Sequence, residues 1–209
     1  MMPEGTLSNS EVEMRENSIR LEVAHMLRIQ GFNDYHPPDM ARSANLTADS
    51  APGRPDLFFL NTKGPTVVVE VKVIEPKARI EPWFDPQHIS NNQRKWLDWW
   101  VFGRQGQGYI AIGTIFGTPR RLWLIPWLNW DLLEKALADK QSQNMSPPAI
   151  IPPARVAISD LEIMRIYECE WKGKGIWELP MGHPVKEIAT LKHDKNQYVE
   201  KSFRFQEII

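Results

Sequence analysis

The stretch TVVVEVKVI at residues 66–74 constrains the fold of this chain more than any other segment. Six of its nine residues are Val or Ile, which favour β-strands, and an almost continuous apolar run is typical of a central strand that is covered on both faces. At a period of two residues, Glu70 and Lys72 lie on the same face of that strand. Unpaired charges are costly in such surroundings, so this pair requires a partner or a function.

A second charged residue stands just before the preceding apolar run, in GRPDLFF at residues 53–59. Residues 56–61 and 66–74 are predicted to pair as an antiparallel hairpin, which brings Asp56 and Glu70 to the same end. These carboxylates and the main-chain carbonyl of Val71 would form a hard oxygen site suited to Mg²⁺, with Mn²⁺ as a possible substitute. Lys72 would then act as an electrostatic stabiliser or proton carrier. The alternative is an exposed hairpin with an ordinary Glu–Lys pair.

The order of the predicted elements indicates an α/β fold. Helical patterns occupy residues 11–30, 88–106 and 129–141, and strand patterns occupy 56–61, 66–74, 108–116 and 120–127. This order of helix, two strands, helix and two strands favours a mixed central sheet. Four prolines within 144–154 indicate a boundary, so we expect a core at 11–143 and a C-terminal extension at 144–209 that packs on it and contains short strands.

The segments GRPDLFF and VVVEVK resemble the signature of the PD-(D/E)xK nuclease superfamily, and the likeness covers roughly residues 11–130. The resemblance implies a restriction-endonuclease-like core, in which a central mixed β-sheet is flanked by helices. It also implies that Asp56 and Glu70 are metal ligands and that Lys72 is the catalytic lysine. The following helix and strands, with QHISNNQRKWLDWW and GQGYIAIGTIF, are similar to RecU-type Holliday-junction resolvases. That similarity implies that Gln93 contacts a metal-bound water or the DNA backbone.

Many members of this superfamily also carry an acidic residue on the first helix. Glu16 lies on the same predicted helical face as Ile19 and Val23 and is our first choice, while Glu22 competes from another face. The alternative for either residue is a solvated helix charge.

The basic and aromatic residues that could contact DNA are concentrated in one part of the chain. The net charge is −1, but residues 72–121 hold eight basic and four acidic residues. Candidate phosphate contacts are Lys77, Arg79, Arg94 and Lys95. Tryptophans occur at positions 96, 99, 100, 123, 127 and 130, where their spacing predicts core packing, with base stacking as the alternative.

These features together predict a Mg²⁺-dependent DNA endonuclease that hydrolyses phosphodiester bonds, most consistent with a structure-selective Holliday-junction resolvase. The symmetry of a junction would imply a homodimer. The alternatives are a restriction-like or mobile-element nuclease acting on linear DNA, and a non-catalytic nucleic-acid-binding module of the same fold.

Other function classes receive no support. One cysteine, Cys169, excludes an intramolecular disulfide framework and a Cys-rich zinc site. No run of about 18 apolar residues and no secretory signal are present, so we expect a cytoplasmic protein without a membrane role. The segments GKGIW and GRQGQG do not match phosphate-binding loops, so we expect no nucleotide cofactor.

Overall fold

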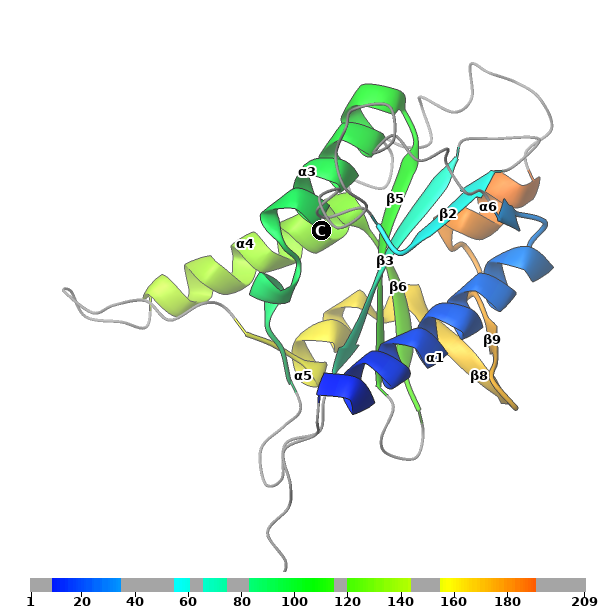
Figure 1. Ribbon diagram of the computed structural model, residues 1–209. Coiled ribbons are helices and arrows are strands. Elements are labelled where there is room, and N and C mark those ends of the chain that lie inside the picture. Colours follow the sequence, from blue (N-terminus) through cyan, green and yellow to red (C-terminus); the bar gives the residue numbers. More distant parts are fainter. Residues whose placement is uncertain are drawn as a thin grey trace, which may run out of the picture.

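A mixed β-sheet with helices on both faces forms the centre of the molecule (Figure 1). The computed structural model describes residues 9–34, 55–60, 66–74, 83–114, 120–143 and 155–190. Within these residues the sheet has seven strands in the order β1-β2-β3-β5-β6-β8-β9. Their bounds are β1 (Asn33–Asp34), β2 (Leu57–Leu60), β3 (Val67–Ile74), β5 (Gln107–Thr114), β6 (Leu122–Pro126), β8 (Glu168–Gly173) and β9 (Ile176–Glu178). The predicted fold class is confirmed: the architecture is α/β and consistent with a restriction-endonuclease-like core.

Strand β3 lies near the middle of the sheet and has different neighbours along its length. It runs parallel to β5 from Val67 to Ile74 and antiparallel to β2, which pairs only with residues 67–69. In the described part of the chain, the second half of β3 therefore has no strand partner on the β2 side. A parallel pair needs a long crossover, which the helices between β3 and β5 provide.

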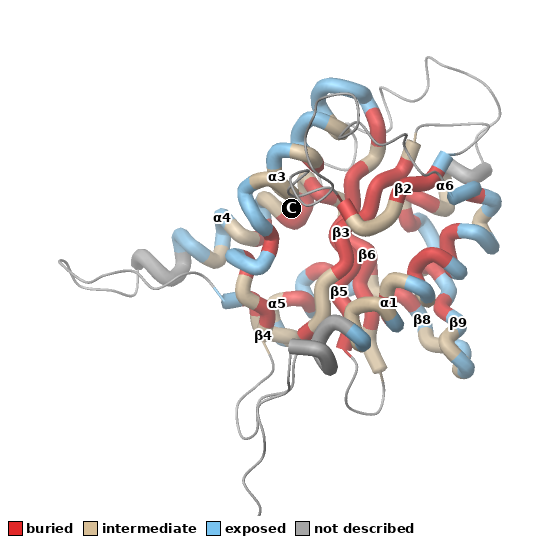
Figure 2. The backbone as a smooth tube through the Cα atoms, in the orientation of Figure 1, coloured by how far each residue is buried: buried red, intermediate tan, exposed pale blue. Residues whose placement is uncertain are grey.

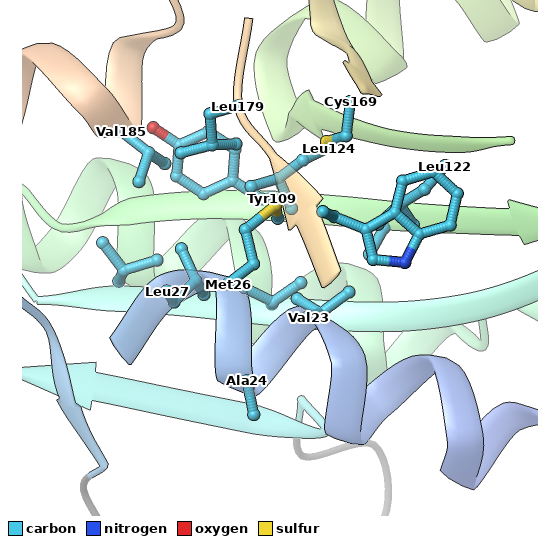
Figure 3. Packing of buried hydrophobic residues seen from close by; sticks show 14 of the residues in the cluster. Val23, Ala24, Met26, Leu27, Tyr109, Leu122, Leu124, Cys169, Leu179 and Val185 are labelled. Atoms are coloured by element: carbon cyan, nitrogen blue, oxygen red, sulfur yellow. The ribbon is translucent and has the colours of Figure 1, made fainter. Parts of the chain in front are cut away.

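Helix α1 (Asn9–Ile29) covers one face of the sheet. Its residues Val23, Met26 and Leu27 pack with Tyr109, Leu122 and Leu124 of the central strands (Figure 3). Ile19 fills the space above a glycine of β5, because an added Cβ at Gly113 would lie only 2.7 Å from its Cδ1 atom. This contact holds the N-terminal half of α1 close to β3 and β5. Gly31, at a φ of +88°, follows the helix in the left-handed conformation that ends many helices.

The other face is covered by the remaining long helices. They are α3 (Asn91–Asp98), which continues into the π-helical segment η3 (Trp99–Gly103), and α4 (Trp127–Gln143). The 3-10 helix η2 (Pro86–His88) precedes α3, and a small sheet of β4 (Trp83–Phe84) and β7 (Val156–Ala157) lies on this side. Figure 2 shows that burial is concentrated in the strands between the two helical layers. Trp123, Trp127 and Trp130 are buried there, which confirms core packing for these three tryptophans.

The C-terminal part differs from the expected run of short strands. Strands β8 and β9 are present, and β8 joins the main sheet beside β6. The preceding segment is instead helical, as α5 (Ile158–Leu161) and η4 (Glu162–Tyr167), before α6 (Pro184–Thr190) ends the described part. The reason is that Leu161, Met164 and Tyr167, spaced by three residues, are the buried positions. The division of the chain into a core and an extension stays a prediction.

No helix within the described ranges is long and apolar enough to cross a membrane.

Candidate active site

The second half of β3 places two opposite charges side by side. Glu70 is fully buried, and its Oε1 atom lies 2.7 Å from the Nζ atom of Lys72, whose side chain is 13% exposed. The contact agrees with the alternation of β3, which predicted that both residues lie on one face of the strand. They lie where β2 no longer pairs with β3, so this edge of β3 is open to groups from both faces of the sheet.

Asp56 is held against this open edge by a main-chain hydrogen bond. It directly precedes β2, and its Oδ2 atom accepts a hydrogen bond of 2.8 Å from the main-chain N–H of Val71. The N–H and C=O of one strand residue point to the same side, so the carbonyl of Val71 lies on the same edge of β3 as Asp56. The hairpin thus brings the two predicted carboxylates and the predicted carbonyl together.

Gln93 reaches the cluster because the start of α3 orients it. The Oγ atom of Ser90 accepts a hydrogen bond from the main-chain N–H of Gln93, and the side-chain oxygen of Gln93 accepts one from the N–H of Ser90. This reciprocal capping box occupies the oxygen of the amide, so its NH₂ group points away from the cap. That group donates a hydrogen bond to Oε1 of Glu70. The capping box that begins α3 therefore also fixes the side chain of Gln93 against Glu70.

The first helix contributes Glu16 rather than Glu22 to this cluster. The Oε1 atom of Glu16 lies 3.5 Å from Nζ of Lys72. Glu22 is engaged elsewhere, because it forms an ion pair with Arg120 and accepts a hydrogen bond of 2.7 Å from the indole N–H of Trp177. Whether Glu16 acts in catalysis stays a prediction.

The sequence reasoning missed one basic residue at the site, Arg20. Burial raises the pKa values of Glu16 and Asp56, and the charge of Arg20 lies close enough to oppose part of this rise. Arg20 follows Glu16 by four residues, which is one helical turn. This spacing could have identified it once Glu16 was chosen.

The cluster combines more negative than positive charge in buried surroundings. Burial raises the pKa of Glu70 to about 8, and the neighbouring charge of Asp56 adds to the effect. Burial also raises the pKa values of Asp56 and Glu16. Burial alone would lower the pKa of Lys72, but the charges of Glu70, Glu16 and Asp56 outweigh it and raise that pKa. Lys72 is therefore protonated at neutral pH, and without a cation the closeness of Asp56 favours the protonated form of Glu70.

The arrangement fits a hard divalent cation. The Oε2 atom of Glu70 is buried and has no hydrogen-bond partner among the residues that the structure describes, although buried carboxylate oxygens normally have one. A cation would supply this partner and reduce the repulsion between Glu70 and Asp56. No group of three or more His, Cys, Asp or Glu side chains among the described residues forms a metal site by itself. Two carboxylates and a carbonyl suit Mg²⁺, which usually keeps several waters.

The predicted DNA contacts divide into three groups. Lys77 and Arg79 lie outside the described residues. Lys95 is exposed on α3. The guanidinium of Arg94 instead binds both carboxylate oxygens of Glu134, at 2.6 and 2.9 Å, and also donates hydrogen bonds to two main-chain carbonyls. These contacts join α3 to α4, and we therefore leave Arg94 out of the DNA surface proposed below.

We expect Arg94→Ala to lower the free energy of unfolding by about 2 kcal/mol, because it removes the two-pronged ion pair with the half-buried Glu134 and two hydrogen bonds to main-chain carbonyls. Lys95→Ala is the matched control on the same helix and should change stability by less than about 0.5 kcal/mol while weakening DNA binding. Urea denaturation and fluorescence anisotropy with labelled DNA measure the two effects. Full stability combined with lost DNA affinity in Arg94→Ala would show that Arg94 is a DNA contact instead.

Comparisons with known proteins were made with family models, curated proteins and solved structures. No protein-family model and no curated protein matches the chain. Among solved structures, the chain is similar to the Holliday junction resolvase Hjc of the archaeal hyperthermophile Archaeoglobus fulgidus. The sequence identity is 13% and the TM-score is 0.32, and the match covers 51% of this chain and 72% of that one. We base the functional proposal on the geometry of the site.

Proposed function

We propose that this protein is a metal-dependent endonuclease that hydrolyses phosphodiester bonds in DNA, with Mg²⁺ as its cofactor and Mn²⁺ as a possible substitute. One observation carries the proposal: Asp56, Glu70 and Lys72 converge at the open edge of β3, where Glu70 keeps a buried oxygen without a partner. A purely structural Glu–Lys pair would not need a second carboxylate beside it, since that carboxylate raises the pKa of Glu70 further.

Asp56, Glu70 and the carbonyl of Val71 are the groups that would hold the ion. Mg²⁺ held there would neutralise charge on the phosphate and would lower the pKa of a water nucleophile. The chain's own residues then position the reactants. Asp56 is fixed by the N–H of Val71, and Glu70 is fixed by the amide of Gln93.

Lys72 supplies positive charge rather than a base. Its pKa is raised by the surrounding carboxylates, so it stays protonated at neutral pH. A fixed ammonium group in a site of low polarity stabilises negative charge as it develops on phosphate oxygens. Glu16 lies within 3.5 Å of that ammonium group and helps to orient it. Arg20 adds a second positive charge near Glu16 and Asp56.

Branched DNA is the substrate that we propose, in keeping with the similarity of residues 84–127 to RecU-type resolvases. A four-way junction requires cuts in two symmetry-related strands, which a homodimer with two sites would make. The test compares cleavage of a labelled four-way junction with cleavage of a linear duplex of the same arm sequence, in Mg²⁺.

We expect the junction to be cut faster than the duplex. Equal rates on both substrates would favour a restriction-like or mobile-element nuclease that acts on linear DNA. DNA binding without cleavage of either substrate, in Mg²⁺ or Mn²⁺, would favour the non-catalytic module.

A further inference from the structure

Four aromatic residues at the end of α3 and in η3, namely Trp96, Trp99, Trp100 and Phe102, form a surface that we call the aromatic platform. The expectation that Trp99 belongs to the core is wrong, because 41% of its surface is exposed. Phe102 is 67% exposed. The far end of α3 and its continuation are correspondingly coloured as exposed in Figure 2. Exposed aromatic residues of this size, gathered in one segment, indicate a binding surface.

Contacts with the sheet hold the aromatic platform in place. The Trp100 indole N–H donates a hydrogen bond of 3.3 Å to the carbonyl of Thr66, just before β3, and Trp100 packs edge-to-face on Phe58 of β2. Trp99 in turn contacts Trp96 and Trp100 edge-to-face, with centroid distances of 5.3 and 5.8 Å. The inner rings are thus anchored to the sheet and hold Trp99 in place. A surface held in this way loses little conformational entropy when a ligand binds.

The local helix geometry and two glycines create the space for these rings. Segment η3 is π-helical, a conformation that occurs frequently at functional sites. A Cβ atom at position 106 would lie 2.2 Å from the indole nitrogen of Trp100, so only glycine fits at Gly106. A Cβ atom at Gly103 would lie 3.2 Å from Cδ1 of Trp99.

The charges around the platform favour an anionic ligand with flat faces. The guanidinium carbon of Arg104 lies 4.7 Å from the centroid of the Trp99 ring. Lys95 is exposed on the same helix, and neither basic residue has an ion-pair partner in the part of the chain that the structure describes. The nearby carboxylate of Asp98 accepts a hydrogen bond of 2.7 Å from Trp127. Stacking aromatic rings with adjacent cations are the combination that binds single-stranded nucleic acid.

The platform lies on the same helix as Gln93 of the candidate active site, further along its axis. Gln93, which contacts Glu70, precedes Trp96 by about one turn on α3. This helix packs on the face of the sheet that β3 and β5 form (Figure 1). Trp99 follows Gln93 by six residues, which places it about 9 Å further along the helix at about 1.5 Å per residue. At about 3.4 Å per nucleotide, this distance corresponds to two or three stacked nucleotides.

We propose that the aromatic platform binds unpaired nucleotides of the DNA substrate, by stacking bases on Trp99 and Phe102 while Lys95 and Arg104 contact phosphates. The inference rests on the proposed function, since it places an unpaired strand beside the catalytic cluster. The bases of an intact duplex are covered by their neighbours and cannot stack on a protein ring. The platform therefore selects DNA that has unpaired nucleotides next to the cleavage position, as branch points and single-stranded flaps do.

The test measures binding directly, without metal, so that it does not depend on cleavage. Fluorescence anisotropy in EDTA gives the affinity of the full-length protein for a labelled single-stranded oligothymidine and for a blunt duplex of equal length. We expect Trp99→Ala and Phe102→Ala each to weaken single-strand binding about tenfold and to leave duplex binding unchanged. Trp99→Phe keeps a stacking ring and should restore most of the affinity.

Leu132→Ala is the matched control, because Leu132 of α4 is exposed to the same extent as Trp99, at 42% against 41%, and lies outside the platform. It should bind both oligonucleotides as the wild type does. Circular dichroism and thermal unfolding confirm that the platform variants are folded. Single-strand affinity that is unchanged in Trp99→Ala and Phe102→Ala, or an equal loss on duplex, would overturn the inference. A changed sedimentation coefficient with unchanged single-strand binding would also overturn it and would identify a contact between copies of this chain.

The results separate this inference from the proposed function. If the wild type cleaves DNA in Mg²⁺ but the platform variants bind single strands normally, the inference fails and the nuclease stands. If the platform variants lose single-strand binding but no condition gives cleavage, the platform is a binding surface for single strands and the nuclease fails. If the wild type neither binds nor cleaves DNA, both fail.

Discussion

Lys72→Ala is expected to slow phosphodiester cleavage by about 10²–10³-fold, the loss typical when one fixed electrostatic donor is removed from an active site. Lys72 is the cation that contacts Glu70 directly, at 2.7 Å, and it lies among three carboxylates. Its pKa is raised, so its contribution is a permanent positive charge, and alanine cannot replace it. The measurement is a single-turnover cleavage rate on a labelled four-way junction in saturating Mg²⁺.

The variant should remain folded, because Glu70 can take up a proton when its cationic partner is lost. The pKa of Glu70 is about 8 even with Lys72 present, and removing that partner raises it further. Lys135→Ala is the matched control, since Lys135 is 68% exposed in its side chain and pairs only with Asp131 in the described structure. It should cleave as the wild type does. Wild-type rates in a folded Lys72→Ala protein would contradict the assignment of Lys72.

Glu70→Gln is expected to stabilise the metal-free protein by about 4 kcal/mol at pH 8 while abolishing metal-dependent cleavage. In the folded protein the pKa of Glu70 is about 8, against an ordinary value of 4.5. Below pH 4.5 the carboxyl is protonated in both the folded and the unfolded state and causes no loss of stability. Between pH 4.5 and 8 only the unfolded state ionises, so wild-type stability falls by up to about 1.4 kcal/mol per pH unit as pH rises.

Urea denaturation in EDTA at pH 5, 6, 7 and 8 measures this difference. The wild-type free energy of unfolding should decline more steeply with pH than that of Glu70→Gln, and Mg²⁺ should raise the thermal midpoint of the wild type alone. The control is Glu162→Gln, because Glu162 is 59% exposed in its side chain. Parallel pH profiles for wild type and Glu70→Gln, or an equal response of both proteins to Mg²⁺, would contradict a buried metal ligand at this position.

Local patterns in the sequence were sufficient to predict the central strands β2, β3, β5 and β6. They also predicted most of the contacts in the candidate site. The period of two residues along β3 predicted that Glu70 and Lys72 share a face, and they are in contact. A short hairpin predicted the approach of Asp56, which binds the N–H of the residue after Glu70. Ser90 caps α3 through a hydrogen bond from the main-chain N–H of Gln93, three residues later. These features depend on residues close in the sequence, so periodicity and turn length determine them. The catalytic roles themselves stay predictions.

Contacts between distant segments could not be predicted in the same way. Arg94 binds Glu134, forty residues later, so its commitment to the α3–α4 contact depends on how the helices pack. The choice between Glu16 and Glu22 likewise depended on Arg120, which binds Glu22 although it lies 98 residues later in the chain. Trp99 was expected in the core because an α-helical period was assumed, whereas π-helical geometry begins at that residue.

The most direct test of the central claim is cleavage of one labelled junction substrate by the wild type and by Asp56→Asn, each in Mg²⁺ and in EDTA. Asp56→Asn can still accept the hydrogen bond from Val71 but lacks the charge that a cation needs. The geometry predicts cleavage by the wild type in Mg²⁺ alone and none by the variant in either condition. Cleavage in EDTA, equal cleavage by Asp56→Asn, or no cleavage by the wild type with Mg²⁺ or Mn²⁺ would contradict the claim that this cluster is a metal-dependent nuclease site.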